Sequence, residues 1–160
     1  MPSIMLNKIE RKLVVVNETK NLKLLRNFVT EVSGEMNVPL PERNKIILAV
    51  DEAVSNIIEH AYDSSHEGKS EVEVILLSEP DKVVITIKDS GREFDPTEIE
   101  DPDIRMHVNE GRKNGLGIFL MRQIMDEVKY TFRAGVENQL VMVKYFKDEG
   151  EDSPGKDFAE

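Results

Sequence analysis

The sequence predicts an α+β fold in which a mostly antiparallel sheet carries helices on one face. Residues 71–79 and 82–89 alternate apolar and polar side chains on either side of a Pro-Asp turn, which is typical of a β-hairpin. Residues 116–128 instead repeat apolar side chains at helical spacing. Strands and helices are mixed along the chain, and hairpin-like strand pairs recur, so helices packed on one face of a sheet would bury the pattern best.

The first part of the chain predicts one strand and two helices. KIERKLVVV (8–16) ends in β-branched residues and predicts a strand. Residues 21–33 place apolar side chains at helical spacing, and Gly34 then indicates a helix end. Two prolines precede a second predicted helix at 41–62. The apolar stripe of this second helix is formed by Ile46, Val50, Ala53, Val54, Ile57 and Ala61.

The last part of the chain predicts a long loop, one helix and two strands. Residues 90–114 combine prolines, glycines and charges of both signs, which indicates a functional or disordered loop with room for a short helix near 96–100. The helix at 116–128 follows, and residues 129–134 and 138–146 predict the two final strands. Six apolar residues are expected to face the core from this helix: Ile118, Phe119, Met121, Ile124, Met125 and Val128.

Length and composition indicate one soluble domain. With 160 residues, the chain suits a single core, which we assign to residues 8–146. Residues 148–160 carry six acidic side chains against one lysine, so an acidic disordered tail is expected over 147–160. No apolar run of about 18 residues is present, and the N-terminus lacks secretory features, so neither a membrane span nor export is expected.

Charge and cysteine content exclude several classes of site. The formal net charge of −10 argues against nonspecific binding to nucleic acid. Because the chain has no cysteine, it can form no disulfide, thiolate zinc site or cysteine nucleophile. This composition is compatible with a cytoplasmic protein.

Glu52 and Asn56 form the first candidate constellation. They are four residues apart on the predicted helix 41–62, so they lie on one face and border its apolar stripe. An Asn oxygen can ligate Mg²⁺ without adding charge, and a Glu one turn earlier could accept a proton from a hydroxyl. The alternative is that both residues belong to the solvated polar edge of an amphipathic helix.

Two further constellations are compatible with a nucleotide. Asp89 ends an apolar strand and could accept a hydrogen bond from an exocyclic amine, while Gly91 would allow close approach of the base. Alternatively, the two residues form an ordinary turn. Gly115 and Gly117 lie where a loop becomes a helix, a place that favours phosphate, although such glycines also serve helix starts. Arg112 and Lys113 add positive charge beside them.

In this order, the three constellations resemble the ATP site of a known superfamily. AVDEAVSNIIEHAY, IKDSGREFD and NGLGIFLMRQIMDEV look like the N-box, G1 box and G2 box of the GHKL ATPases, whose fold is an α/β sandwich with ATP under a flexible lid. Within that superfamily, the sequence is most similar to the bacterial anti-sigma factor serine/threonine kinases. The resemblance covers about residues 8–146.

The resemblance implies a role for each matching residue. Glu52 would be the general base toward a substrate serine, Asn56 would ligate Mg²⁺, and Asp89 would bind the adenine amine beside Gly91. Residues 93–114, approximately, would form the lid over ATP. Phosphate would be contacted through the backbone of the turn that opens the last helix, and the remaining predicted cofactor-binding residues are Arg112, Lys113, Gly115, Leu116, Gly117 and Ile118.

Two positions depart from the superfamily pattern. Glu93 replaces a glycine of the D-x-G-x-G motif, although D-x-G-x-x-F-D resembles the anti-sigma subclass. Glu137, Asn138 and Gln139 stand where Gly-Thr is common, so the contact that a threonine would make there is left open.

By resemblance, the chain is a cytoplasmic anti-sigma factor that uses ATP and Mg²⁺. It would bind an RNA polymerase sigma factor, phosphorylate an anti-sigma factor antagonist (a STAS domain) and form a homodimer, with no direct role for nucleic acid or membrane. One alternative is a nucleotide-dependent binding module without kinase activity. Another is the catalytic domain of a sensor histidine kinase, which His60, His66 and His107 do not support because none lies on a separate preceding helical hairpin.

Overall fold

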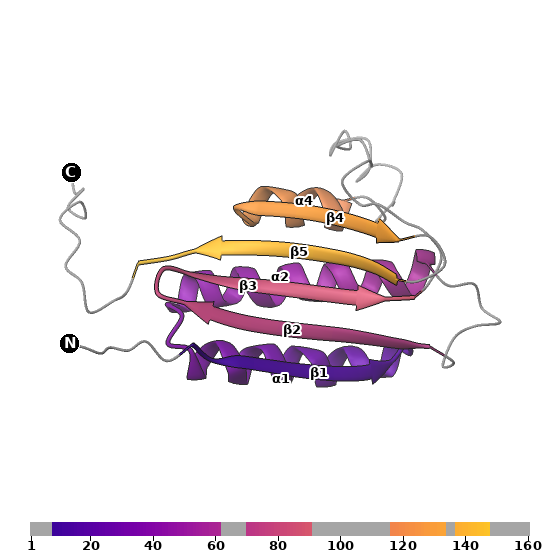
Figure 1. The fold of residues 1–160 in the computed structure, drawn as a ribbon, viewed down its shortest axis with the longest axis horizontal. Helices are drawn as coiled ribbons and strands as arrows, with labels where there is room; N and C mark the ends of the chain where they lie inside the picture. The colour runs from indigo at the N-terminus through magenta and orange to yellow at the C-terminus, as the bar shows by residue number, and fades with distance from the viewer. Residues whose placement is uncertain (1–7, 62–69, 91–115, 134–136, 148–160) are drawn as a thin grey trace.

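Five antiparallel strands form one sheet. The structure, a computed structural model, describes residues 8–61, 70–90, 116–133 and 137–147. The strands are β1 (Glu10–Val16), β2 (Glu71–Glu79), β3 (Lys82–Asp89), β4 (Glu127–Arg133) and β5 (Glu137–Tyr145). They lie in the order β1-β2-β3-β5-β4, so β5 is inserted between β3 and β4 (Figure 1).

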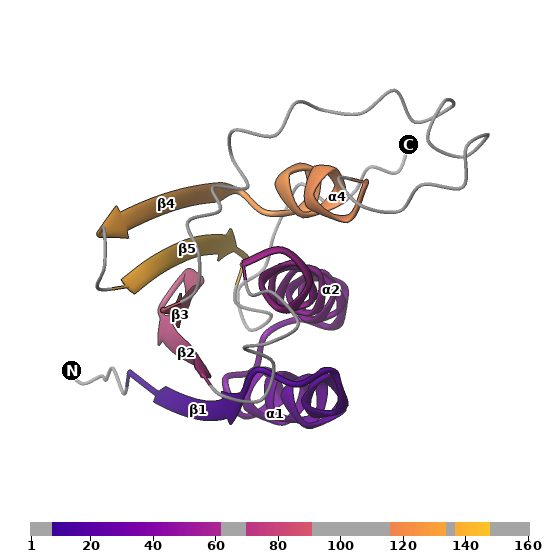
Figure 2. The ribbon, with the colours of Figure 1, turned by 90° about the vertical axis from the view of Figure 1, so that its right-hand side faces the viewer.

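Within the described residues, three helices cover one face of this sheet and none covers the other, which we call the open face (Figure 2). They are α1 (Leu22–Glu35), α2 (Leu40–Asn56) and α4 (Leu116–Ile124). A 3₁₀ turn, Thr19–Asn21, leads into α1, and a π-helical turn, Ile57–Ala61, continues α2 beyond Asn56. The described part of the chain is therefore a two-layer sandwich.

The core lies between the helices and the covered face of the sheet. Strands β2 and β3 alternate buried and partly exposed residues along their whole length, because successive side chains of a strand point to opposite faces. Val72, Val74 and Leu76 of β2 and Val83, Ile85 and Ile87 of β3 are completely buried. Burial of these aliphatic side chains against α1 and α2 is the main contribution to the stability of the sandwich.

The predicted fold class is confirmed, and so is the hairpin of β2 and β3 at the predicted bounds. The helix predicted at 116–128 is too long. Helix α4 ends at Ile124, and Asp126 N–H already donates to the Val143 carbonyl, 2.9 Å away, which begins the pairing of β4 with β5. Val128 lies on β4 and packs against the core from there, since its apolar side chain suits either period.

The end of α1 also differs from the prediction. The helix runs past Gly34 to Glu35, and the residue with a left-handed backbone is Asn37, with φ of 60°. Asn tolerates this conformation better than most residues do, so it can terminate a helix as glycine does. Val38 N–H then donates to the Ser33 carbonyl at 3.1 Å, which turns the chain toward α2.

Several sequence predictions lie outside the described residues. These are most of the turn at 63–70, the lid over 93–114, the short helix near 96–100 and the tail from 148 onward. Among the residues that the structure describes, no helix combines the length and the apolar character that crossing a bilayer requires.

Candidate active site

The predicted site residues that the structure describes lie at one end of the sheet. Val16 at the end of β1 pairs with Glu71 at the start of β2. Val72 pairs with Asp89 at the end of β3, and Asp89 pairs with Asn138 near the start of β5. Helix α2 finishes at the same end (Figure 1). The helix and strand segments that carry the predicted chemistry are thus brought together.

The first residues of α4 also point toward this end. Strand β4 starts at the opposite end of the sheet, because Glu127 pairs with Val143 near the end of β5. Only two residues separate Glu127 from Ile124, so the last turn of α4 lies at that opposite end. The Lys144 ammonium fixes it there by donating to the Ile124 carbonyl at 2.8 Å. The N-terminal end of α4 lies toward the end of the sheet that carries the candidate site (Figure 1).

Asn56 occupies the last position of the α-helical part of α2. Asn56 is 7% exposed, so it belongs to the buried face rather than to a solvated edge. The Asn56 amide Nδ2 donates to the Glu52 carbonyl at 2.7 Å, one turn earlier. This bond uses the donor end of the carboxamide, which orients the acceptor end, Oδ1, away from that carbonyl. The π-helical turn that follows Asn56 was not predicted, and such turns often occur at functional sites.

Glu52 lies one turn before Asn56 and is partly buried. Burial raises the pKa of the Glu52 carboxyl above its ordinary value, and the negative charges of Asp51 and Glu59 raise this pKa further. The neighbouring Asp51 is held on the α1 side of the helix, since the Arg26 Nε donates to its Oδ1 at 2.8 Å. A carboxylate with an elevated pKa is better matched to accept a proton near neutral pH.

Asp89 lies on the helix-covered face of the sheet and is 7% exposed. Its register neighbours there, Val72 and Asn138, are also buried. The Asn138 amide Nδ2 donates to Asp89 Oδ1 at 3.1 Å. No role was predicted for Asn138 from the sequence. The sequence marked Asn138 only as part of the segment in which Gly-Thr is missing. Because Asp89 and Asn138 are 49 positions apart, the sequence did not indicate that they pair.

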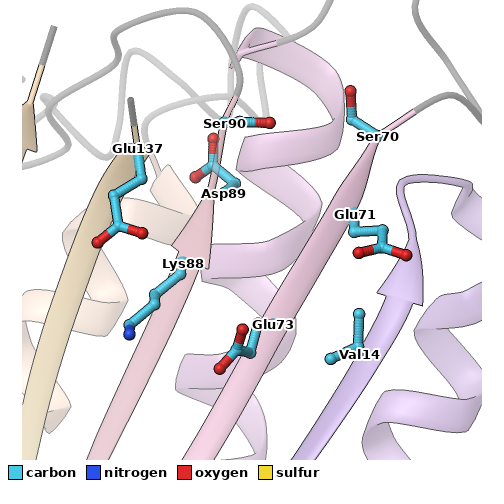
Figure 3. A pocket seen from close by; sticks show the side chains of 8 residues that line it. All are labelled: Val14, Ser70, Glu71, Glu73, Lys88, Asp89, Ser90 and Glu137. Carbon is cyan, nitrogen blue, oxygen red and sulfur yellow. The ribbon is translucent and has the colours of Figure 1, made fainter. Parts of the chain in front are cut away.

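A hollow on the other face of the sheet shares Asp89 with the candidate site (Figure 3). It is lined by Val14, Ser70, Glu71, Glu73, Lys88, Asp89, Ser90 and Glu137. Glu73 and Lys88 are register partners that alternate with buried residues, so they belong to the face that the helices leave open. Because Asp89 has its buried neighbours on the covered face, we place the candidate active site on the helix side.

The remaining predicted site residues are described only in part. Gly91, Arg112, Lys113 and Gly115 lie outside the described residues. The first turn of α4 is formed by Leu116, Gly117 and Ile118. A helix start here is what the predicted phosphate contact requires of the backbone. The side chains of these three residues lie outside the described part of the structure. Within the described ranges, no group of three or more His, Cys, Asp or Glu residues could hold a metal ion.

Comparison with known proteins identifies the family. The sequence profile of the histidine kinase-like ATPase domain matches residues 15–144, from the end of β1 to the end of β5. The serine-protein kinase RsbW of Bacillus velezensis is 30% identical over 136 residues, which cover 82% of each chain. The chain belongs to the RsbW family of histidine kinase-like ATPase domains. The family prediction made from the three sequence boxes is thereby confirmed, and membership in an ATPase family indicates ATP as the nucleotide.

Two further matches are informative. The serine-protein kinase RsbW of Listeria monocytogenes serovar 1/2a is 33% identical over 105 residues. That match covers 63% of this chain and 64% of the Listeria protein, slightly less than two thirds of its length. A crystal structure of the RsbU and RsbW domains of a Mycobacterium tuberculosis protein has a TM-score of 0.55 at 16% identity. It covers 84% of this chain and 32% of the other, and it supports the fold alone.

Proposed function

We propose that this chain is an ATP-dependent protein serine kinase that also acts as an anti-sigma factor. It would bind an RNA polymerase sigma factor in the cytoplasm and phosphorylate a serine of an anti-sigma factor antagonist, a STAS-domain protein. The names of the matched relatives, serine-protein kinase RsbW, support the kinase part of this proposal. The two partners and a homodimeric state follow from the family resemblance of the sequence.

The observation that carries the proposal is the arrangement of Glu52 and Asn56 on α2. Glu52 has a raised pKa, and it lies one turn before a buried Asn56 at the end of the sheet where Asp89 also lies. A binding module that only held nucleotide would not need a partly buried carboxylate crowded by Asp51 and Glu59. In the proposed reaction, Glu52 accepts the proton of the substrate serine as the serine oxygen attacks the γ-phosphorus of ATP. The bond from that phosphorus to its bridging oxygen breaks, and ADP leaves.

Asn56 suits the proposed magnesium site. Its Nδ2 is held by the Glu52 carbonyl, so the carboxamide is oriented with its neutral oxygen available as a ligand. Mg²⁺ commonly takes one or two protein oxygens and completes its coordination with water and phosphate oxygens, so a cluster of carboxylates is not required. When bound, Mg²⁺ would neutralise the developing charge on the phosphates.

The other proposed contacts bind the adenine and the phosphates of ATP at two different structural elements. Asp89 at the end of β3 would accept a hydrogen bond from the adenine amine, with Gly91 beside the base. Arg112, Lys113, Gly115 and the first turn of α4, residues 116–118, would receive the phosphates, since backbone N–H groups at a helix start favour anions. We assign these functions to a domain over 8–146 and none to the tail 147–160.

Phosphorylation of an antagonist tests the kinase proposal directly. The purified chain is incubated with Mg-ATP and a STAS-domain antagonist encoded beside it, and phosphoserine is measured by mass spectrometry. Stoichiometric phosphorylation that depends on ATP supports the proposal. ATP binding without any phosphoserine, in the presence of an antagonist that binds the chain, would favour the alternative of a regulatory binding module.

A further inference from the structure

We infer that Lys144 is a positioning residue for phosphate binding: by bonding the last carbonyl of α4, it holds the first turn of that helix where the phosphates of the nucleotide are proposed to bind. The inference rests on the proposed phosphate-binding function of this first turn. Lys144 pairs with Val83 near the start of β3, so it lies at the opposite end of the sheet from the candidate site.

Lys144 is a buried cation at the end of a helix. Only 9% of its side chain is exposed, and it projects from β5 on the helix-covered face, as its buried register partner Val83 does. Its ammonium donates to the carbonyl of Ile124, the last residue of α4, at 2.8 Å and lies 3.5 Å from Asp126 Oδ2. The last carbonyls of an α-helix lack a donor within the helix, so Lys144 satisfies a group that α4 cannot satisfy itself.

Neighbouring residues of β5 bond the chain just beyond α4. The Val143 carbonyl accepts a hydrogen bond from Asp126 N–H at 2.9 Å, and the Tyr145 N–H donates to Asp126 Oδ2 at 2.7 Å. Asp126 lies beyond the helix, whereas Ile124, the acceptor for Lys144, belongs to it. Lys144 therefore links β5 to the helix itself, and the other two bonds hold the segment that follows.

The stability of the fold alone does not require a charge at position 144. Lysine is rarely buried, and exchange of a buried ion pair for apolar side chains of similar volume is often neutral or stabilising. The core includes Met121 of α4 and Met142 of β5, both completely buried. Methionine can pack in several arrangements, so such contacts hold a helix against a sheet without fixing its position along its axis. The hydrogen bond from Lys144 is directional and can fix that position.

A displacement at one end of α4 is carried to the other end. The nine residues of α4 span about 13 Å at a rise of about 1.5 Å per residue, and a helix this short moves as one body. Backbone N–H groups of its first turn, residues 116–118, must lie about 2.7–3.2 Å from phosphate oxygens to bind them. Release of the helix at Ile124 should therefore weaken binding of the phosphates and spare binding of the base at β3.

Three variants isolate the hydrogen bond. Lys144→Met removes the ammonium and keeps most of the aliphatic side chain, so the core stays filled. Lys144→Arg keeps a cation that can donate to a carbonyl. Lys82→Met is the control, because it makes the same substitution at the same end of the sheet, where Lys82 pairs with Tyr145 on the open face. Folding of each variant is checked by thermal unfolding.

The readout is the ratio of the dissociation constants for AMP and ATP, measured by calorimetry with Mg²⁺ present. Both ligands carry the same base and ribose, so the ratio reports what the two terminal phosphates add to affinity. The ratio should fall by about tenfold in Lys144→Met, the equivalent of one hydrogen bond to a charged group. It should stay within about threefold of wild type in Lys144→Arg and in Lys82→Met.

Each result supports or overturns the inference. A folded Lys144→Met with an unchanged ratio would overturn it, even if AMP and ATP both bind more weakly, and so would an equal fall in Lys144→Arg or in Lys82→Met. If Lys144→Met does not fold, Lys144→Leu takes its place, and failure of both to fold would overturn the inference by making Lys144 a requirement of the fold.

The proposed function beneath the inference fails in a different way. A wild-type chain that binds neither nucleotide, or that binds AMP as tightly as ATP, would remove the first turn of α4 from the proposed phosphate site. A wild-type chain that strongly prefers ATP, together with an unchanged ratio in Lys144→Met, would overturn the role of Lys144 alone.

Discussion

The two halves of the candidate site are built in different ways. The half on α2 is local, because Asn56 donates to a carbonyl only four residues earlier and a single helical turn sets the geometry. The half on the sheet is not local, because Asp89 and Asn138 meet only when β3 and β5 pair across 49 positions. The helix half carries the proposed chemistry, and the strand half carries the proposed recognition of the base.

This difference indicates that the two halves can be changed separately. A helix holds its residues in place through its own hydrogen bonds, so a substitution at Glu52 should leave the strands unaffected. A cross-strand pair depends on the packing of two elements, so a substitution there affects base recognition and local stability. Effects at sites without shared partners usually add, which makes the separation measurable.

The largest expected effect comes from the metal side of the helix half. Asn56→Ala removes the proposed oxygen ligand, so the increase in ATP affinity that Mg²⁺ provides should be abolished. Loss of the hydrogen bond to the Glu52 carbonyl should lower the free energy of unfolding by only about 0.5–1.5 kcal/mol, so the fold should persist. Calorimetric titration with and without Mg²⁺ is the measurement, with Ser55→Ala as control. Equal affinity of variant and wild type would refute the assignment.

A smaller effect is expected from Asp51, whose charge lies beside the proposed general base Glu52. Glu52 must be ionised to accept a proton, so the phosphorylation rate should decrease as the pH falls through its raised pKa. Asp51→Asn removes one of the charges that raise this pKa and keeps an acceptor for Arg26, so the acid limb should move to lower pH. The pH–rate profile is compared with that of Glu31→Gln, an exposed site on α1 with the same change of charge. An unmoved limb would exclude Asp51 from tuning the base.

Lowering the pH should slow phosphorylation but remove a destabilising charge at Glu52. Because the pKa of Glu52 is raised in the folded protein, its ionised form opposes folding at neutral pH, and this penalty disappears as the pH falls through the raised pKa. Glu52→Gln should therefore raise the Tm slightly at pH 7 and not at pH 4. Thermal unfolding at both pH values checks this. A lower Tm at pH 7 would indicate that the carboxylate stabilises the fold instead.

The smallest effect is expected outside both halves. Ending the chain after Lys147 keeps Phe146, which packs against the core and whose N–H donates to the Asp81 carbonyl at 3.0 Å. Phosphorylation rate and ATP affinity should both stay within about twofold, since neither proposed half includes the tail. A folded truncation that loses kinase activity would extend the functional domain to the C-terminus.

The local half of the site could be predicted from the sequence, and the non-local half only in part. The spacing of Glu52 and Asn56 places them on one helical face in any α-helix, so the prediction needed no tertiary information. Asp89 could be identified from its motif. Its partner Asn138 could not, because the pairing of β3 with β5 depends on β5 being inserted between β3 and β4.

The prediction of where α4 ends was wrong for a related reason. Ile124, Met125 and Val128 continue an apolar helical pattern. Contacts with β5, beginning with the hydrogen bond from Asp126 N–H to the Val143 carbonyl, commit the chain to the sheet. The burial of Asn56 was also underestimated, since its place beside the apolar stripe predicted a border position. Asn56 is 7% exposed in the structure.

The most direct test of the central claim is to measure rate and affinity together on Glu52→Gln. If Glu52 is the base of a kinase, phosphorylation of a bound antagonist at saturating ATP should slow by about 10²–10⁴-fold, the typical contribution of general base catalysis. The dissociation constant for Mg-ATP should stay within about threefold, because glutamine keeps the shape and Asn56 keeps the metal ligand. A rate within about threefold of wild type at unchanged affinity would contradict the account and favour a regulatory binding module.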